Sequence, residues 1–144
     1  MQDKVQEKTQ EKMQELAQRF QLNLLVLLGS YAAGDFRQGE SDIDLAYLGD
    51  EIKGIERHLE LINELSRIFE YSKIDLIDLQ KASGLLKYEI AVKGRVLFER
   101  SEGLFERYKL YCYRYYYDTD KFRQGKKEFF REQLEGLLNG KNRA

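Results

Sequence analysis

The feature that most limits the fold of this chain is a short apolar run, Leu24-Leu25-Val26-Leu27-Leu28, that ends at Gly29. A continuous apolar run of this length, stopped by a glycine, favours a β-strand over a helix. Because no position in the run is polar, both faces of the strand are expected to be buried. The run therefore predicts a sheet that other elements cover on both sides.

The remaining elements follow from the periodicity of the apolar residues. Alternation predicts strands over 42–48 and 73–79, with a brief strand over 95–98. Helical spacing predicts helices over 2–19, 53–69, 83–92 and 102–138, where a second helix could start near residues 118–120. The predicted fold class is α/β (α+β): a small mixed β-sheet flanked by helices, with a helical C-terminal segment.

Length and composition predict one globular domain over residues 1–144, with a core at about 20–100 and C-terminal helices at about 102–138. The 24 Lys and Arg residues nearly balance the 25 Asp and Glu residues, so no stable nucleic-acid binding is expected. The single Cys112 is interpreted as a packed thiol. Without a signal sequence or an apolar run near the ~20 residues of a membrane span, we expect a soluble, cytoplasmic protein with no membrane partner.

Two carboxylates open the second predicted strand. Asp42 and Asp44 are two residues apart, so both side chains point to one face, roughly 6–7 Å apart at the backbone. Two acids on one face repel each other, and divalent metal ions supply the compensating charge. Mg²⁺ takes one or two carboxylates together with water and substrate phosphates. An exposed or capping role is the alternative for either aspartate.

A Gly-Ser pair follows the first strand. Gly29 lets the backbone approach a phosphate closely, and Ser30 adds a hydroxyl donor. A Gly-Ser turn alone is most often only a turn. The combination of strand, Gly-Ser turn, polar loop and Ser41-Asp42-Ile43-Asp44 instead indicates a metal-dependent nucleotide site.

The run LLGSYAAGDFRQGESDIDLAYL resembles the signature of the DNA polymerase β-type nucleotidyltransferases, specifically the minimal nucleotidyltransferase (MNT) group. The likeness continues through 53–69, KIDLIDL and 94–98, and it implies a nucleotidyltransferase fold, ATP as substrate and two Mg²⁺ ions. The residues it implies for the nucleotide are Gly29, Ser30, Arg37 and Ser41. The residues it implies for catalysis and the metals are Asp42, Asp44 and Asp75.

The choice of Asp75 as the third carboxylate can also be tested against the pattern of its predicted strand. Asp75 shares a face with Ile77 and Leu79, where a carboxylate is costly to bury unless something pairs with it. A neighbouring strand with metal-bound aspartates would provide that. Asp78 is the alternative, but it lies on the other face and nearer the strand end.

The chain departs from the family pattern in the intervening loop. Residues 31–41 place eleven positions between the Gly-Ser pair and the aspartates, where the group commonly has ten. Family members often carry Arg where this chain has Ala33, and Arg37 could supply that charge.

The resemblance also implies a function. Members of the MNT group are antitoxins of HEPN/MNT pairs, and the implied reaction transfers AMP from ATP to a tyrosine of the partner HEPN toxin. Two alternatives are an antitoxin that acts by binding alone and a nucleotidyltransferase that acts on a small molecule. A polymerase or tRNA-modifying role is disfavoured by the near-zero net charge.

A tyrosine-rich segment and helix 53–69 allow predictions about which side chains are exposed. The segment 108–117 contains six tyrosines, which either pad the neighbouring elements or form a partner-binding face. Helix 53–69 is expected to bury one stripe and to leave His58 on its exposed side. The residues of that expected stripe are Ile55, Leu59, Ile62, Leu65, Ile68 and Phe69.

Overall fold

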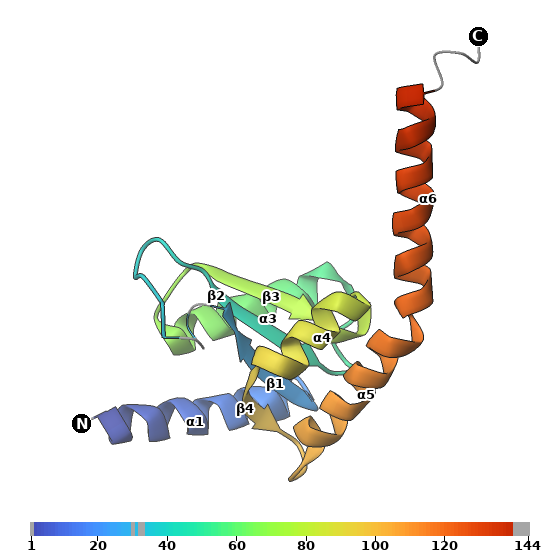
Figure 1. The fold of residues 1–144 in the computed structure, drawn as a ribbon. Coiled ribbons are helices and arrows are strands. Elements are labelled where there is room, and N and C mark those ends of the chain that lie inside the picture. Colours follow the sequence, from blue (N-terminus) through green and yellow to red (C-terminus); the bar gives the residue numbers. More distant parts are fainter. Residues whose placement is uncertain (1, 30, 32–33, 140–144) are drawn as a thin grey trace.

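The computed structural model describes residues 2–29, 31 and 34–139, and every predicted strand and helix is present in it within a few residues (Figure 1). Its elements are α1 (Gln2–Arg19), β1 (Leu24–Leu28), β2 (Ile43–Leu48), α3 (Gly54–Phe69), β3 (Ile74–Asp78), a short turn η1 (Leu79–Lys81), α4 (Gly84–Lys93), β4 (Arg95–Glu99), α5 (Leu104–Asp118) and α6 (Asp120–Asn139).

The four strands form one mixed sheet in the order β3-β2-β1-β4. β1 runs antiparallel to both of its neighbours, whereas β2 and β3 are parallel and are joined by α3. Parallel neighbours need such a crossover, because the chain must return to the same end of the sheet. The predicted α/β class with a small mixed sheet is confirmed.

The apolar run of β1 is buried at all five positions, as expected. Its side chains alternate between two cores on opposite faces of the sheet. Leu25 and Leu27 belong to the core under α1 and α3, and Leu24, Val26 and Leu28 belong to the core under α4 and α5. Full burial of one such side chain stabilises the fold by about 1.5–3 kcal/mol. A slip of one residue would exchange the two faces, so this burial also determines the register of the sheet.

The buried stripe of α3 matches the expected one in part, because Ile62, Ile68 and Phe69 are half-buried against the core as predicted. Leu61 and Leu65 are fully buried, while Ile55 and Leu59 are 67% and 49% exposed. A stripe centred on Leu61 and Leu65 includes the position three residues before Leu61, which is His58. The surface prediction for His58 is therefore wrong: its ring is half-buried, and its Nδ1 lies 3.2 Å from the hydroxyl of Tyr47 on β2.

The C-terminal helices are α5, which packs along α4, and α6, which extends away from the sheet (Figure 1). Phe105 and Cys112 are the buried residues of α5, so the expectation of a packed thiol is confirmed. Within the described part of the chain, no helix combines the length and apolar character needed to cross a membrane.

Candidate active site

Asp44 and Asp75 occupy directly paired positions on the parallel strands β2 and β3. Each is the second residue of its strand. Paired residues on neighbouring strands point to the same face, with backbones roughly 5 Å apart. The face is the one covered by α4 and α5, since Leu28 pairs with Asp44 and belongs to that core. The two carboxylates thus lie in one row at the end of β1.

Asp42 lies just outside this row, because β2 begins at Ile43. The amide of Ile43 donates to the backbone carbonyl of Lys73 at 2.8 Å, and this bond starts the pairing with β3. Asp42 and Asp75 are exposed, and Asp44 is half-buried. The three predicted carboxylates therefore share one open end of the sheet.

The electrostatics of Asp44 show how close these groups are. Burial raises the pKa of Asp44, and the negative charges of Asp75 and then Asp42 raise it further. A like charge nearby disfavours the ionised form of a carboxylate, and a bound cation offsets that effect. The end of the sheet thus concentrates negative charge around Asp44.

Gly29 brings the backbone after β1 directly against this row. Its φ of +68° is a conformation that side chains disfavour. A Cβ atom at this position would overlap Oδ2 of Asp44. Only glycine therefore allows the backbone at this position to pass this close to the carboxylate of Asp44. Ser30 and Ala33 lie outside the described residues.

Arg37 and Ser41 lie in the loop that leads to Asp42. The amide of Arg37 donates to Oγ of Ser41 at 3.0 Å, so this hydroxyl takes part in the loop's own turn. The Arg37 side chain is 80% exposed, with its guanidinium 3.9 Å from Glu40. Nucleotide binding by Arg37 and Ser41 remains a prediction.

Tyr71 and Lys73 contact the same loop and were not singled out from the sequence. The Tyr71 hydroxyl and the Lys73 ammonium both hydrogen-bond to the backbone of Gly39, more than thirty residues away. Contacts at such separations leave no local pattern in the sequence. The only available signal was their place immediately before the strand that carries Asp75.

The donor set of Asp42, Asp44 and Asp75 fits Mg²⁺. In residues 2–29, 31 and 34–139, no three His, Cys, Asp or Glu side chains are gathered closely enough to hold an ion. Mg²⁺ does not need such a cage, because water and substrate phosphates complete its octahedron. Carboxylate oxygens with uncompensated charge beside a close-approach glycine are suitable partners for it.

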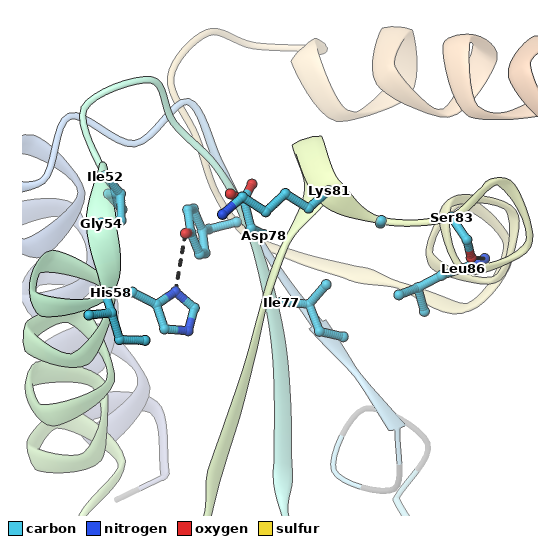
Figure 2. Close-up of a pocket in the computed structure, with 11 residues that line it drawn as sticks. Ile52, Gly54, His58, Ile77, Asp78, Lys81, Ser83 and Leu86 are labelled. Carbon is cyan, nitrogen blue, oxygen red and sulfur yellow. Dashed lines mark hydrogen bonds between the residues drawn. The ribbon is translucent and has the colours of Figure 1, made fainter.

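A separate groove of about 450 Å³ lies at the opposite ends of β2 and β3 (Figure 2). It is lined by side chains from α3, β3, η1 and α4, and Figure 2 shows His58 and Ile77 on different sides of β3. Asp78 lies here, paired with Tyr47 in the sheet, and its Oδ1 accepts the amide of Gln80 at 3.0 Å. Asp78, the alternative third carboxylate, therefore points away from Asp44. Asp75, in contrast, lies beside Asp44.

Comparison with known proteins identifies a family and a curated relative. The family model "Polymerase beta, Nucleotidyltransferase" matches residues 11–103. The protein adenylyltransferase MntA of Shewanella oneidensis (strain MR-1) is 37% identical over 79 residues, which are 54% of this chain and 55% of that protein. The matched segment thus spans about half the length of this curated relative.

Two solved structures are similar over most of the chain. A toxin–antitoxin structure with AMP-PNP has a TM-score of 0.70 at 25% identity and covers 84% of this chain and 97% of that one. A tri-AMPylated HEPN toxin of Shewanella oneidensis in complex with its MNT antitoxin provides the second match. It has a TM-score of 0.65 at 24% identity, with 87% and 98% covered, and it supports the fold.

Proposed function

Since the chain belongs to the polymerase beta nucleotidyltransferase family, we propose that it is a cytoplasmic, Mg²⁺-dependent protein adenylyltransferase. In this proposal it is the antitoxin of a HEPN/MNT pair and transfers AMP from ATP to a tyrosine of its partner toxin. The observation that carries the proposal is the pairing of Asp44 with Asp75 beside the Gly29 turn.

The relatives support each part of the reaction. The curated relative is named a protein adenylyltransferase, which indicates AMP as the group transferred. One similar structure contains AMP-PNP, an ATP analogue, and another contains an AMPylated HEPN toxin with its antitoxin. Together they favour ATP as the donor and a HEPN protein as the acceptor.

The residues divide the chemistry between them. Gly29 admits the triphosphate beside Asp44, and Asp42, Asp44 and Asp75 would hold Mg²⁺. The bound ions would neutralise phosphate charge and stabilise the departing pyrophosphate. The tyrosine oxygen attacks the α-phosphorus, the bond from that phosphorus to pyrophosphate breaks, and the phenolic proton passes to a carboxylate oxygen of Asp75. Positioning and charge neutralisation account for most of the rate enhancement in reactions of this type.

The sheet topology suits a protein acceptor. β3 is an edge strand, and Asp75 is exposed on it. A tyrosine carried by another protein can reach this carboxylate without displacing any strand of the sheet. The edge position of β3 is therefore compatible with a macromolecular acceptor.

Transfer of label tests the proposal directly. The protein is incubated with Mg²⁺, ATP labelled at the α-phosphate and the HEPN protein encoded beside it. We expect label on a toxin tyrosine, and Asp42→Asn and Asp44→Asn should each abolish the transfer. Asp50→Asn is the matched control, because Asp50 is an exposed carboxylate near the opposite end of β2 that bonds Gln80.

Two outcomes would contradict the proposal. Neutralisation of the toxin that survives undiminished in Asp42→Asn and Asp44→Asn would indicate an antitoxin that acts by binding alone. Label found only on a small molecule, with none on the HEPN protein, would indicate a different acceptor class.

A further inference from the structure

The loop between the Gly29 turn and Asp42 is tied to the connection between α3 and β3. We propose that Tyr71 in this connection is a positioning residue that holds Asp42 beside Asp44 and Asp75 before metal and nucleotide bind. The inference rests on the proposed function, because it assigns Tyr71 a role toward the metal-binding carboxylates.

The Tyr71 hydroxyl joins two points of the loop. It accepts a hydrogen bond from the amide of Gly39 at 3.0 Å and donates one to the carbonyl of Ser41. Nζ of Lys73 donates to the carbonyl of Gly39 at 2.6 Å. Both polar backbone atoms of Gly39 and the carbonyl before Asp42 are therefore bound to one short segment of chain.

The residue after Asp42 is held by the same segment. The amide of Ile43 donates to the carbonyl of Lys73 at 2.8 Å. Asp42 thus lies between Ser41, which is bound to Tyr71, and Ile43, which is bound to Lys73. This double attachment restricts the backbone of an exposed residue that lies outside any strand.

Tyr71 is itself held in place. Its amide donates to the carbonyl of Ser66 at 3.1 Å, and its carbonyl accepts from the Ser66 hydroxyl at 2.8 Å. Its ring packs edge-on against Phe36, with centroids 5.1 Å apart. A hydroxyl on a side chain fixed in this way can determine the position of the loop.

The ring contacts continue to the nucleotide side of the site. Phe36 contacts Tyr31 at 4.9 Å between centroids, and Tyr31 contacts Phe69 at 5.9 Å. Tyr31 is two residues from Gly29. This aromatic cluster of Tyr31, Phe36, Phe69 and Tyr71 therefore links the Gly29 turn to the loop that presents Asp42.

A tie of this kind has a clear physical effect. Asp42 is exposed and lies outside β2, so the hydrogen bonds of its neighbours Ser41 and Ile43 are what restrict its backbone. A loop held in place before binding does not have to be ordered when the ions arrive. Loss of the Tyr71 hydroxyl should therefore weaken metal binding even though Tyr71 is no metal ligand.

Tyr71→Phe tests this because it keeps the ring and removes only the hydroxyl. Mn²⁺ serves as the metal probe, titrated into the full chain with AMP-PNP and followed by electron paramagnetic resonance. We expect affinity for Mn²⁺ to fall about tenfold, as for other residues that orient metal ligands. Amide hydrogen exchange of residues 37–42 without metal should become faster. Lys73→Met, which removes the second tie to Gly39, should change both measurements in the same direction.

Tyr47→Phe is the matched control, because it loses one hydroxyl contact, to His58, at the other end of β2. It should leave both measurements unchanged. Unaltered exchange of 37–42 in Tyr71→Phe would overturn the inference, as would faster exchange with wild-type affinity for Mn²⁺. Asp42→Asn separates the proposed function from the inference about Tyr71. If this variant keeps wild-type affinity for Mn²⁺, the proposed metal role of Asp42 is wrong. If it loses affinity and Tyr71→Phe does not, only the role of Tyr71 is wrong.

Discussion

Asp44 and Asp75 are register partners on parallel strands, so their carboxylates meet on one face at the end of the sheet. Burial and the charges of Asp75 and Asp42 together raise the pKa of Asp44. The folded protein therefore tolerates a charge repulsion that the unfolded chain does not have. Such local costs are typical of sites arranged for a ligand that brings the opposite charge.

The repulsion predicts that Asp44→Asn stabilises the protein when divalent metal is absent. The pKa of Asp44 is higher in the folded than in the unfolded protein, so protonated Asp44 makes its full contribution to folding stability below the unfolded pKa of about 4. It is lost as pH rises through the higher folded pKa. Thermal unfolding in EDTA should give a higher Tm for Asp44→Asn than for the wild type at pH 7, and the two should converge near pH 3. If Asp44→Asn is less stable than the wild type at pH 7, the negative charge of Asp44 is already compensated in the folded protein.

Gly29→Ala should damage both stability and activity. An alanine at a φ of +68° costs about 1–2 kcal/mol, and its Cβ would also overlap Asp44. Gly54→Ala is the matched control, since Gly54 has a φ of +83° with open space around it. Denaturant unfolding should show a loss in both variants, larger in Gly29→Ala. AMP transfer should fall only in Gly29→Ala, and equal activity of the two variants would contradict the close-approach role of Gly29.

Much of the fold could be predicted because its periodicities are local. The run of β1 and the alternation in β2 and β3 predicted the strands, and the parity of Asp75 along β3 placed it correctly relative to Asp78. The stripe of α3 was predicted in part: Leu65 is buried as expected, but Ile55 and Leu59 also occur at helical spacing, and only packing on the sheet selects Leu61 in their place.

The parts of the site that could not be predicted depend on tertiary contacts. The hydrogen bond between Gly39 and Tyr71 joins residues 32 positions apart. The contact of His58 with Tyr47 likewise depends on how α3 lies across β2. Neither contact can be predicted from a pattern within one helix or strand. The aspartates of the carboxylate site, in contrast, could be predicted from the patterns of their own strands.

Removing two tyrosine hydroxyls should change stability by different amounts. Among the described residues, the hydroxyl of Tyr108 is the one buried side-chain nitrogen or oxygen without a nitrogen or oxygen partner, and it faces only the weakly bonding thiol of Cys112, whereas the hydroxyl of Tyr47 contacts His58. Removing a satisfied hydroxyl costs about 0.5–1.5 kcal/mol, while removing an unsatisfied one is neutral or stabilising. Denaturant unfolding should therefore show a loss for Tyr47→Phe and none for Tyr108→Phe. A comparable loss in Tyr108→Phe would mean that the contact of its hydroxyl with the Cys112 thiol is a stabilising hydrogen bond.

The tyrosine-rich segment of α5 divides into two groups that a binding experiment can separate. Tyr111 and Tyr117 are 50% and 66% exposed, while the other four tyrosines in 108–117 are half-buried. The exposed pair presents most surface to a partner, and tyrosine is favoured at interfaces because its ring packs while its hydroxyl stays hydrated.

We therefore expect Tyr111→Ser with Tyr117→Ser to leave Tm and AMP-PNP binding unchanged and to weaken binding of the proposed HEPN partner in calorimetry by about 1–2 kcal/mol. Leu59→Ser is the matched control, because Leu59 is 49% exposed on α3, which packs on the opposite face of the sheet. Unchanged binding by the double variant would mean that these tyrosines only pad the helices, whereas a large loss of Tm would mean that they support the fold.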